Sequence, residues 1–283
     1  MKELKMMEWN INGRTGFGGN YCLPITILID QIQMENPDVC VLVEFTKSCG
    51  YLDFEYILNE MGYDLFATDY MKDWNGVAIV VKKEFNPVLV EQRTDMICAE
   101  KWPDYLRVDA EIDGNMFSII GTRIRTISKF VKRKEQLDLL INHLEEINND
   151  FAVLGDFNNG NILCEYDREY AEYDRERKYY NYQMIWRNVE DNHNWTFVTP
   201  NQGEGYESSH SIVTEYKGNR THTKDDHMIT SLEKETIVSA KYDWHFVNVK
   251  NGYYNCDMNS VLSKKIGKPD HAVLLIELEM SNG

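Results

Sequence analysis

The stretch Ala152–Asn158, with the sequence AVLGDFN, joins a short apolar run to a glycine and two polar residues. A short apolar run of this kind suits a buried strand. Asp156 and Asn158 are two positions apart, so in extended backbone their side chains face the same side. We therefore expect a buried strand that delivers a carboxylate and an amide at its carboxyl end.

Polar residues stand at the ends of other strand candidates as well. Asn10 with Asn12, then Glu44, then Arg123 each follow an earlier strand candidate. Asp226 with His227, and Asp270 with His271, each precede a late strand candidate. If the late strands run antiparallel to the earlier ones, all of these groups meet at one edge of the core. The sequence thus predicts a single site assembled from distant segments.

Strand and helix signals alternate along the chain without a linker or an internal repeat. The strand candidates are Leu4–Ile11, Val39–Val43, Val77–Val81, Phe117–Ile120, Ala152–Leu154, Met228–Ile229, Phe246–Val249 and Ala272–Leu278. Helical patterns cover Ile25–Met34, Leu52–Met61 and the apolar face Leu137–Ile147, and Glu165–Tyr182 suits an exposed helix. Asp113-Gly114 is a hairpin signal, because that dipeptide tolerates the positive φ of a type I′ turn. We predict one domain over residues 1–283, an α/β (α+β) sandwich with mixed sheets.

Composition bounds the class of protein. The chain has 283 residues, 43% of them hydrophobic and 27% charged, which is ordinary for a soluble globular protein. No apolar run approaches the ~20 residues that span a bilayer. Met1–Lys5 lacks the features of a signal peptide, and the six cysteines contain no Cys-x-x-Cys pair. We expect reduced thiols, no membrane span and a cytoplasmic protein.

The formal net charge is −16, whereas proteins that grip nucleic acid unspecifically usually carry a basic face. Three basic stretches run against this total: Arg123, Arg125, Lys129, Lys132, Arg133 and Lys134, then Lys217, Arg220 and Lys224, then Lys264, Lys265 and Lys268. Each is either a solvated surface run or part of a local positive field. We expect them on loops around the mouth of the predicted site.

Carboxylate and amide oxygens are ligands for a hard cation such as Mg²⁺ or Mn²⁺ rather than zinc. Each polar residue has a simpler interpretation by itself, because an acid at a strand end often caps a turn and Asn-Gly pairs often form turns. The ordered set of residues favours chemistry. A phosphodiester is an anion that repels hydroxide, so its cleavage needs charge neutralisation and an aligned water, which a metal and positioned carboxylates supply.

In chain order, the sequence contains WNING at Trp9–Gly13, then Val43-Glu44, then GDFN at Gly155–Asn158, then DHMI at Asp226–Ile229, then PDH at Pro269–His271. This set resembles the endonuclease/exonuclease/phosphatase superfamily, which includes exonuclease III, abasic-site endonucleases and deoxyribonuclease I. The resemblance extends from residue 9 to about residue 278. It implies a four-layered sandwich in which two packed mixed β-sheets are flanked by helices, with the site at one end.

The resemblance also implies a metal site. Glu44 would be the principal ligand of Mg²⁺, with Mn²⁺ as a substitute, and Asn10 would support it. Asn12 stands where some members have Asp and would be a secondary metal contact, and Asp270 would lie near the metal.

The remaining site residues would act on water and phosphate. The resemblance makes Asp156 the residue that positions or deprotonates the attacking water and Asn158 the residue that holds a phosphate oxygen. His271 would face the scissile phosphate, oriented by Asp226. Whether Asp156 or His271 removes the proton stays open.

The sequence departs from the nuclease pattern at two positions. Arg123 stands where members often have Tyr or His, and Val43 stands where they often have Gln before the metal-binding Glu44. Arg123 would either clamp a substrate phosphate bidentately or pair with a glutamate of the body. These differences concern the substrate more than the metal chemistry.

The function expected from the sequence is a metal-dependent phosphodiesterase, a nuclease that hydrolyses DNA or RNA. The first alternative is a phosphatase or phosphodiesterase for a small ester, such as a nucleotide, phosphoinositide or lipid head group, which the acidic total favours. The second is a catalytically silent binding module of the same fold. The residues leave substrate, polarity of cleavage and oligomeric state open.

Overall fold

The computed structural model describes residues 2–11, 25–47, 50–69, 75–93, 102–126, 130–159, 180–200, 210–216, 219–244 and 271–280. Several sequence predictions lie outside these ranges, namely Asn12, Asp270, the strand candidate at 246–249, most of the helix candidate at 165–182, and the basic residues Lys129, Lys217, Lys264, Lys265 and Lys268. No helix in the described ranges is both long enough and apolar enough to cross a bilayer.

The first sheet has six strands in the order β13-β14-β1-β2-β4-β3. Their bounds are β1 (Lys2–Asn10), β2 (Val39–Phe45), β3 (Tyr63–Ala67), β4 (Gly76–Lys82), β13 (Ile237–Asp243) and β14 (Val273–Met280). β1 and β2 are parallel, and the other neighbours are antiparallel. The parallel pair is joined through the helical segment α1 (Ile25–Glu35), as a parallel connection requires a crossover.

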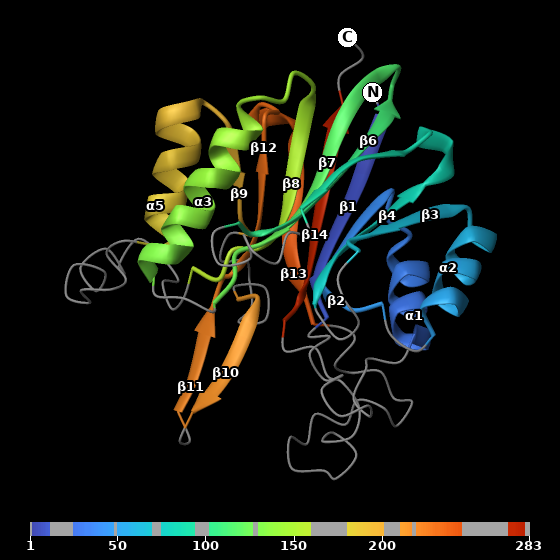
Figure 1. The fold of residues 1–283 in the computed structure, drawn as a ribbon, viewed down its shortest axis with the longest axis horizontal. Coiled ribbons are helices and arrows are strands. Elements are labelled where there is room, and N and C mark those ends of the chain that lie inside the picture. Colours follow the sequence, from blue (N-terminus) through green and yellow to red (C-terminus); the bar gives the residue numbers. More distant parts are fainter. Residues whose placement is uncertain are drawn as a thin grey trace.

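The second sheet repeats this plan, with six strands in the order β5-β6-β7-β8-β12-β9. Their bounds are β5 (Val88–Arg93), β6 (Asp104–Ile112), β7 (Asn115–Arg123), β8 (Asp150–Asp156), β9 (Thr196–Val198) and β12 (Asp226–Thr230). Here β7 and β8 are the parallel pair, and α3 (Phe130–Leu144) connects them. A separate two-stranded hairpin, β10 (Ile212–Tyr216) and β11 (Asn219–Thr223), projects beyond one end of the sandwich (Figure 1).

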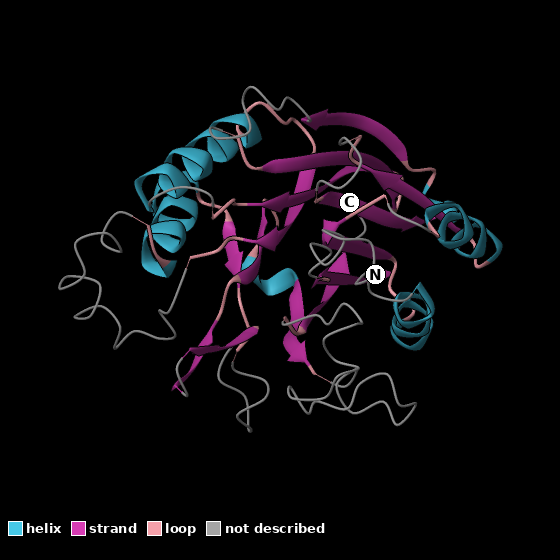
Figure 2. Cartoon of the chain, turned by 60° about the horizontal axis from the view of Figure 1, so that its bottom comes forward, coloured by secondary structure: helices cyan, strands magenta, loops and turns pink. Residues whose placement is uncertain are grey.

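The sheets pack face to face with helices outside (Figures 1 and 2). One buried cluster fills the space between the sheets, with Met6, Val41 and Leu154 among its members. A second lies between the first sheet and the helices α1 and α2 (Tyr51–Glu60), and a third packs the second sheet against α3 and α5 (Tyr182–Trp186). Short helical turns complete the described chain at η2 (Lys83–Phe85), η4 (Arg187–Asp191) and η6 (Lys234–Thr236). The predicted four-layered sandwich is confirmed.

The sequence predicted the β6–β7 hairpin and the antiparallel late strands correctly. Asp113 and Gly114 join β6 to β7 with φ of 50° and 78°, the left-handed values that a type I′ turn needs. The late strands β12 and β14 run antiparallel to β8 and β1, which is the condition for a single site. One expectation was wrong. Lys132, Arg133 and Lys134 lie in the first turns of α3 rather than on a loop, because that helix begins at Phe130, before the apolar face that starts at Leu137.

Candidate active site

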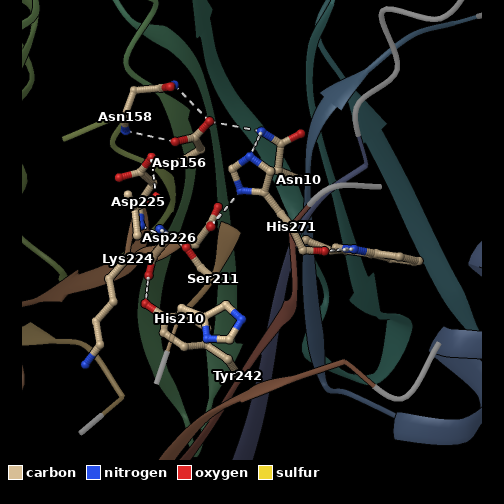
Figure 3. A network of polar contacts seen from close by, with 12 residues as sticks. Asn10, Asp156, Asn158, His210, Ser211, Lys224, Asp225, Asp226, Tyr242 and His271 are labelled. Carbon is tan, nitrogen blue, oxygen red and sulfur yellow. Dashed lines mark hydrogen bonds and ion pairs between the residues drawn. The ribbon is translucent and has the colours of Figure 1, made fainter. Parts of the chain in front are cut away.

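The polar strand ends meet at one end of the sandwich. β8 ends at Asp156, and in the sheet register Asp156 lies beside Arg123 of β7 on one side and Asp226 of β12 on the other. Asn10 ends β1 of the opposite sheet, and His271 lies two residues before the start of β14, the antiparallel neighbour of β1. Two sheets therefore contribute to one cluster, and its side chains point toward one another (Figure 3).

A continuous chain of contacts links these residues. His271 Nδ1 lies 2.7 Å from Asp226 Oδ2, and His271 Nε2 lies 3.5 Å from the amide nitrogen of Asn10. That same nitrogen donates to Asp156 Oδ2 at 2.9 Å (Figure 3). Because Asn10 presents a donor to Nε2, the network assigns the ring proton to Nδ1, where Asp226 accepts it. The expected hydrogen bond between Asp226 and His271 is present.

Asp156 is held by donors from both sheets. Besides Asn10, it accepts hydrogen bonds from the backbone and amide nitrogens of Asn158, each at 2.8 Å. Asn158 has a φ of 47°, a conformation that Asn tolerates better than most residues and that folds its side chain back toward Asp156. Its amide nitrogen also donates to the Ile124 carbonyl at 2.8 Å. In this structure Asn158 therefore orients Asp156.

The cluster is buried and rich in carboxylates. Asp226 is fully buried and Asp156 nearly so, and Asp225 lies beside them (Figure 3). Burial raises the pKa of the Asp156 carboxyl to about 8; the charge of His271 opposes this rise, and those of Asp226 and Asp225 add to it. Several acids in one buried place favour a bound cation, because added positive charge would offset the repulsion between their carboxylates.

Glu44 lies in the same layer of strand ends, on β2 beside β1. Its φ of 56° is uncommon for a residue with a side chain, and such conformations cluster at functional sites. Arg123 reaches across from the other sheet, with Nη2 at 2.5 Å from Glu44 Oε1, and Asn75 donates to Oε2 at 2.9 Å. The sequence predicted that Arg123 would either clamp a substrate phosphate or pair with a glutamate. In the structure Arg123 forms an ion pair with Glu44.

The donor set suits a hard cation. Glu44 offers a carboxylate, and Asn10 commits its amide nitrogen to Asp156 and His271, which leaves its carbonyl oxygen directed away from them (Figure 3). Oxygen ligands of this kind fit Mg²⁺, which keeps several waters and needs few carboxylates from the protein. The described part of the chain contains no group of three or more His, Cys, Asp or Glu residues placed to hold a metal.

Several residues of the site escaped the sequence reasoning. Ser211 Oγ accepts from the backbone nitrogens of Asp225 and Asp226, at 2.8 Å and 3.3 Å, and so fixes the start of β12. Asn75 and Ser211 lie between strands, where no periodic signal marks them. Glu8 did have a signal, since it is an acid within the apolar run of β1, on the same face as Asn10.

Glu8 is fully buried between the sheets, and within the described chain neither of its carboxyl oxygens has a hydrogen-bond partner. Burial raises its pKa well above the usual range, and the charge of Asp226 adds to the rise. An acid in this position is held neutral, because a buried unpaired carboxylate is costly.

The glycine before Asp156 permits the close pairing of β7 and β8. A Cβ on Gly155 would lie 1.9 Å from the carbonyl oxygen of Thr122, a backbone atom that cannot move aside cheaply. We expect Gly155→Ala to lower the free energy of unfolding by about 3 kcal/mol, measured in urea. The control is Gly62→Ala, where a Cβ meets no atom within 4 Å but φ is 87°; it should cost about 1 kcal/mol. Equal losses in both variants would contradict this account.

The comparisons with known proteins agree with this fold. The sequence model of the endonuclease/exonuclease/phosphatase family matches residues 7–163. No curated protein sequence matches the chain. Among solved structures, TDP2 of D. rerio complexed with single strand DNA product is 12% identical with a TM-score of 0.64, and the alignment covers 99% of this chain and 100% of that one.

Two further structures share the architecture. The human Nocturnin catalytic domain with bound sulfate is 16% identical with a TM-score of 0.59, over 99% of this chain and 95% of that one. ANGEL2, a 2′,3′-cyclic phosphatase in complex with adenosine-2′,3′-vanadate, is 13% identical with a TM-score of 0.60, over 98% of this chain and 96% of that one. The chain thus shares the fold of these three structures. This chain belongs to the endonuclease/exonuclease/phosphatase family.

Proposed function

We propose that this protein is a divalent-metal-dependent phosphodiesterase that hydrolyses DNA or RNA, acting on short or single-stranded segments. The observation that carries the proposal is the connected array of Asp226, His271, Asn10 and Asp156, which joins both sheets within hydrogen-bond reach. A binding module of the same fold would not need this buried and costly arrangement of acids. The array therefore favours turnover over the silent alternative.

Glu44 and Asn10 are the described residues that would hold Mg²⁺ or Mn²⁺, and we propose Asn12 and Asp270 as further contacts. When bound, the cation would neutralise charge on the phosphate and lower the pKa of a water. The positive φ of Glu44 and the position of Asn10 at the end of β1 support this assignment.

The other residues would act on the water and the phosphate. Asp156, held by Asn10 and Asn158, offers fixed acceptor oxygens that would align the attacking water. His271 would face the scissile phosphate, with its ring held in place by the contact between Nδ1 and the carboxylate of Asp226. Asn158 would contact a phosphate oxygen once substrate draws its amide away from Ile124. Either Asp156 or His271 can accept the proton of the water.

Charge supports a small or locally presented substrate. Many cations of the first basic stretch are paired with acids: Lys132 with Glu135, Lys134 with Asp138, and Arg125 with Asp104. These pairs remove much of the positive field that a long duplex would need. The ligands named for the related structures, a single strand DNA product and an adenosine vanadate, support a nucleic-acid end or single strand.

The test is a substrate screen with purified protein and Mg²⁺ or Mn²⁺. Single-stranded DNA and RNA, long duplex, abasic duplex and small phosphate esters would be compared at two salt concentrations, with Asp156→Asn as the inactive control. We expect single strands to be cleaved about tenfold faster than long duplex, because the acidic body repels extended polyanions. Hydrolysis confined to small esters would favour a phosphatase or phosphodiesterase for a small phosphate ester, a function that the paired cations also support. Tight binding and fast cleavage of long duplex would contradict the charge argument.

A further inference from the structure

Arg123 lies between two carboxylates that belong to different sheets. Its Nη2 atom is 2.5 Å from Glu44 Oε1 on β2, and its Nη1 atom is 3.9 Å from Asp104 Oδ2 on β6. The Arg123 and Asp104 side chains are buried, and that of Glu44 is only 10% exposed. The guanidinium therefore makes a close contact with Glu44 and holds a second acid just beyond hydrogen-bond distance.

Asp104 is well placed to accept Arg123 more closely. It lies directly opposite Arg123 in the register of β6 and β7, so a change of side-chain torsion without backbone movement brings the two groups together. Arg125 contacts the other oxygen of Asp104, with Nε donating to Oδ1 at 2.8 Å. The oxygen that faces Arg123 is therefore not the one that Arg125 uses.

We propose that Arg123 is a positioning residue that competes with the divalent cation for Glu44 and moves from Glu44 to Asp104 when the cation binds. The inference rests on the proposed function, in which Glu44 is the metal ligand. A guanidinium and a divalent ion on one buried carboxylate repel each other, and at short separation inside a protein this repulsion is strong. Arg123 thus neutralises Glu44 while no cation is bound, and it weakens cation binding by having to leave.

Cation binding by itself tests this competition, without turnover. Free Mn²⁺ would be measured by electron paramagnetic resonance during titration of the parent and of variants whose folding is verified by circular dichroism. Arg123→Met keeps the length of the side chain and removes the competing charge. We expect it to bind Mn²⁺ about tenfold more tightly, because the cation no longer has to displace a positive charge from Glu44. Asp104→Asn removes the charge that receives Arg123, and it should bind Mn²⁺ more weakly than the parent.

Arg133 provides the matched control for a general charge effect. Its Nη1 atom donates to the carbonyl of Asn158 at 2.6 Å, so it is a cation near the site that is bound just after β8. Arg133→Met should change the Mn²⁺ affinity by less than about twofold. Arg123→Lys keeps the charge but replaces the fork by a single ammonium group, and its affinity should lie between those of the parent and Arg123→Met.

The outcomes separate the inference from the proposed function. Unchanged or weaker binding in Arg123→Met, with normal binding in the parent, would overturn the inference alone, as would equal tightening in Arg133→Met. Absence of Mn²⁺ binding in every variant would overturn the metal role of Glu44 and the inference together. A crystal structure of the parent with Mn²⁺ checks the movement without substitution. Arg123 should then lie within about 3 Å of Asp104 and no longer contact Glu44; an intact Arg123–Glu44 pair beside a bound ion would overturn the proposal.

Discussion

Glu44→Gln should lower the turnover number about a thousandfold while leaving the fold intact. The amide keeps the shape and the hydrogen-bonding capacity of the side chain, but it removes the negative charge that would hold the divalent cation. A cation that stabilises the transition state by several kcal/mol accounts for a loss of this size. The measurement is kcat on a single-stranded oligonucleotide under saturating Mg²⁺, together with a thermal melt of the variant.

Chelation provides a second measurement of the same dependence. Chelator should abolish hydrolysis by the parent, and added Mg²⁺ or Mn²⁺ should restore it. Glu35→Gln is the control for the substitution, because Glu35 pairs with Lys5 at 2.9 Å on the outer helix α1, far from the strand ends. It should retain parental turnover. Full activity of the parent in chelator would refute a metal mechanism.

His271→Ala and Asp226→Asn should lower kcat strongly and without additivity. We expect a loss of about a thousandfold for His271→Ala and about a hundredfold for Asp226→Asn, with the double variant no slower than His271→Ala. Asp226 would not contact the substrate. Its carboxylate orients His271 through the 2.7 Å contact with Nδ1. An asparagine there presents either a donor or a weaker acceptor to Nδ1, so it disfavours the ring orientation and tautomer that the network holds.

The comparison requires a double-mutant cycle in kcat, since Asp226 is buried and its loss also affects stability. Asp138→Asn on α3 is the control for replacing a carboxylate, because its pair with Lys134 is partly exposed. Independent, additive losses at Asp226 and His271 would show that the two residues do not work as a pair.

Much of the fold is local information. A short continuous apolar run marks strands such as Val39–Phe45, the helical period marks Tyr51–Glu60, and Asp113-Gly114 fixes a hairpin, because each signal depends only on residues a few positions apart. Most boundaries differed from the prediction by one or two residues, as expected where element ends fray, but α3 begins at Phe130, seven residues before the predicted apolar face Leu137–Ile147. The exposed helix predicted at 165–182 lies mostly outside the described residues, so it stays a prediction.

The site was predictable in part for a related reason. A polar residue directly after a buried strand must emerge at an edge of the sheet, so Asn10, Glu44 and Asp156 could be placed at strand ends from the chain alone. The sequence also contains the residues that form the Asp226–His271 pair. That they come within 2.7 Å of each other although 45 positions apart depends on β12 and β14 entering different sheets at the same end.

By itself, the sequence determined the strands and helices with strong local signals, such as β1, β2, β4, β8 and β14, and which chemical groups stand at their ends; the strands β3, β5, β9, β10, β11 and β13 were not predicted. The tertiary structure alone decided the partners of those groups: Glu44 and Asp104 for Arg123, Asn75 for Glu44, and a fully buried place between the sheets for Glu8. The physical reason is one of range. Backbone periodicity is set by neighbours along the chain, whereas the burial and pairing of a charge depend on which surfaces pack together, here the facing sides of two sheets whose strands come from both ends of the sequence.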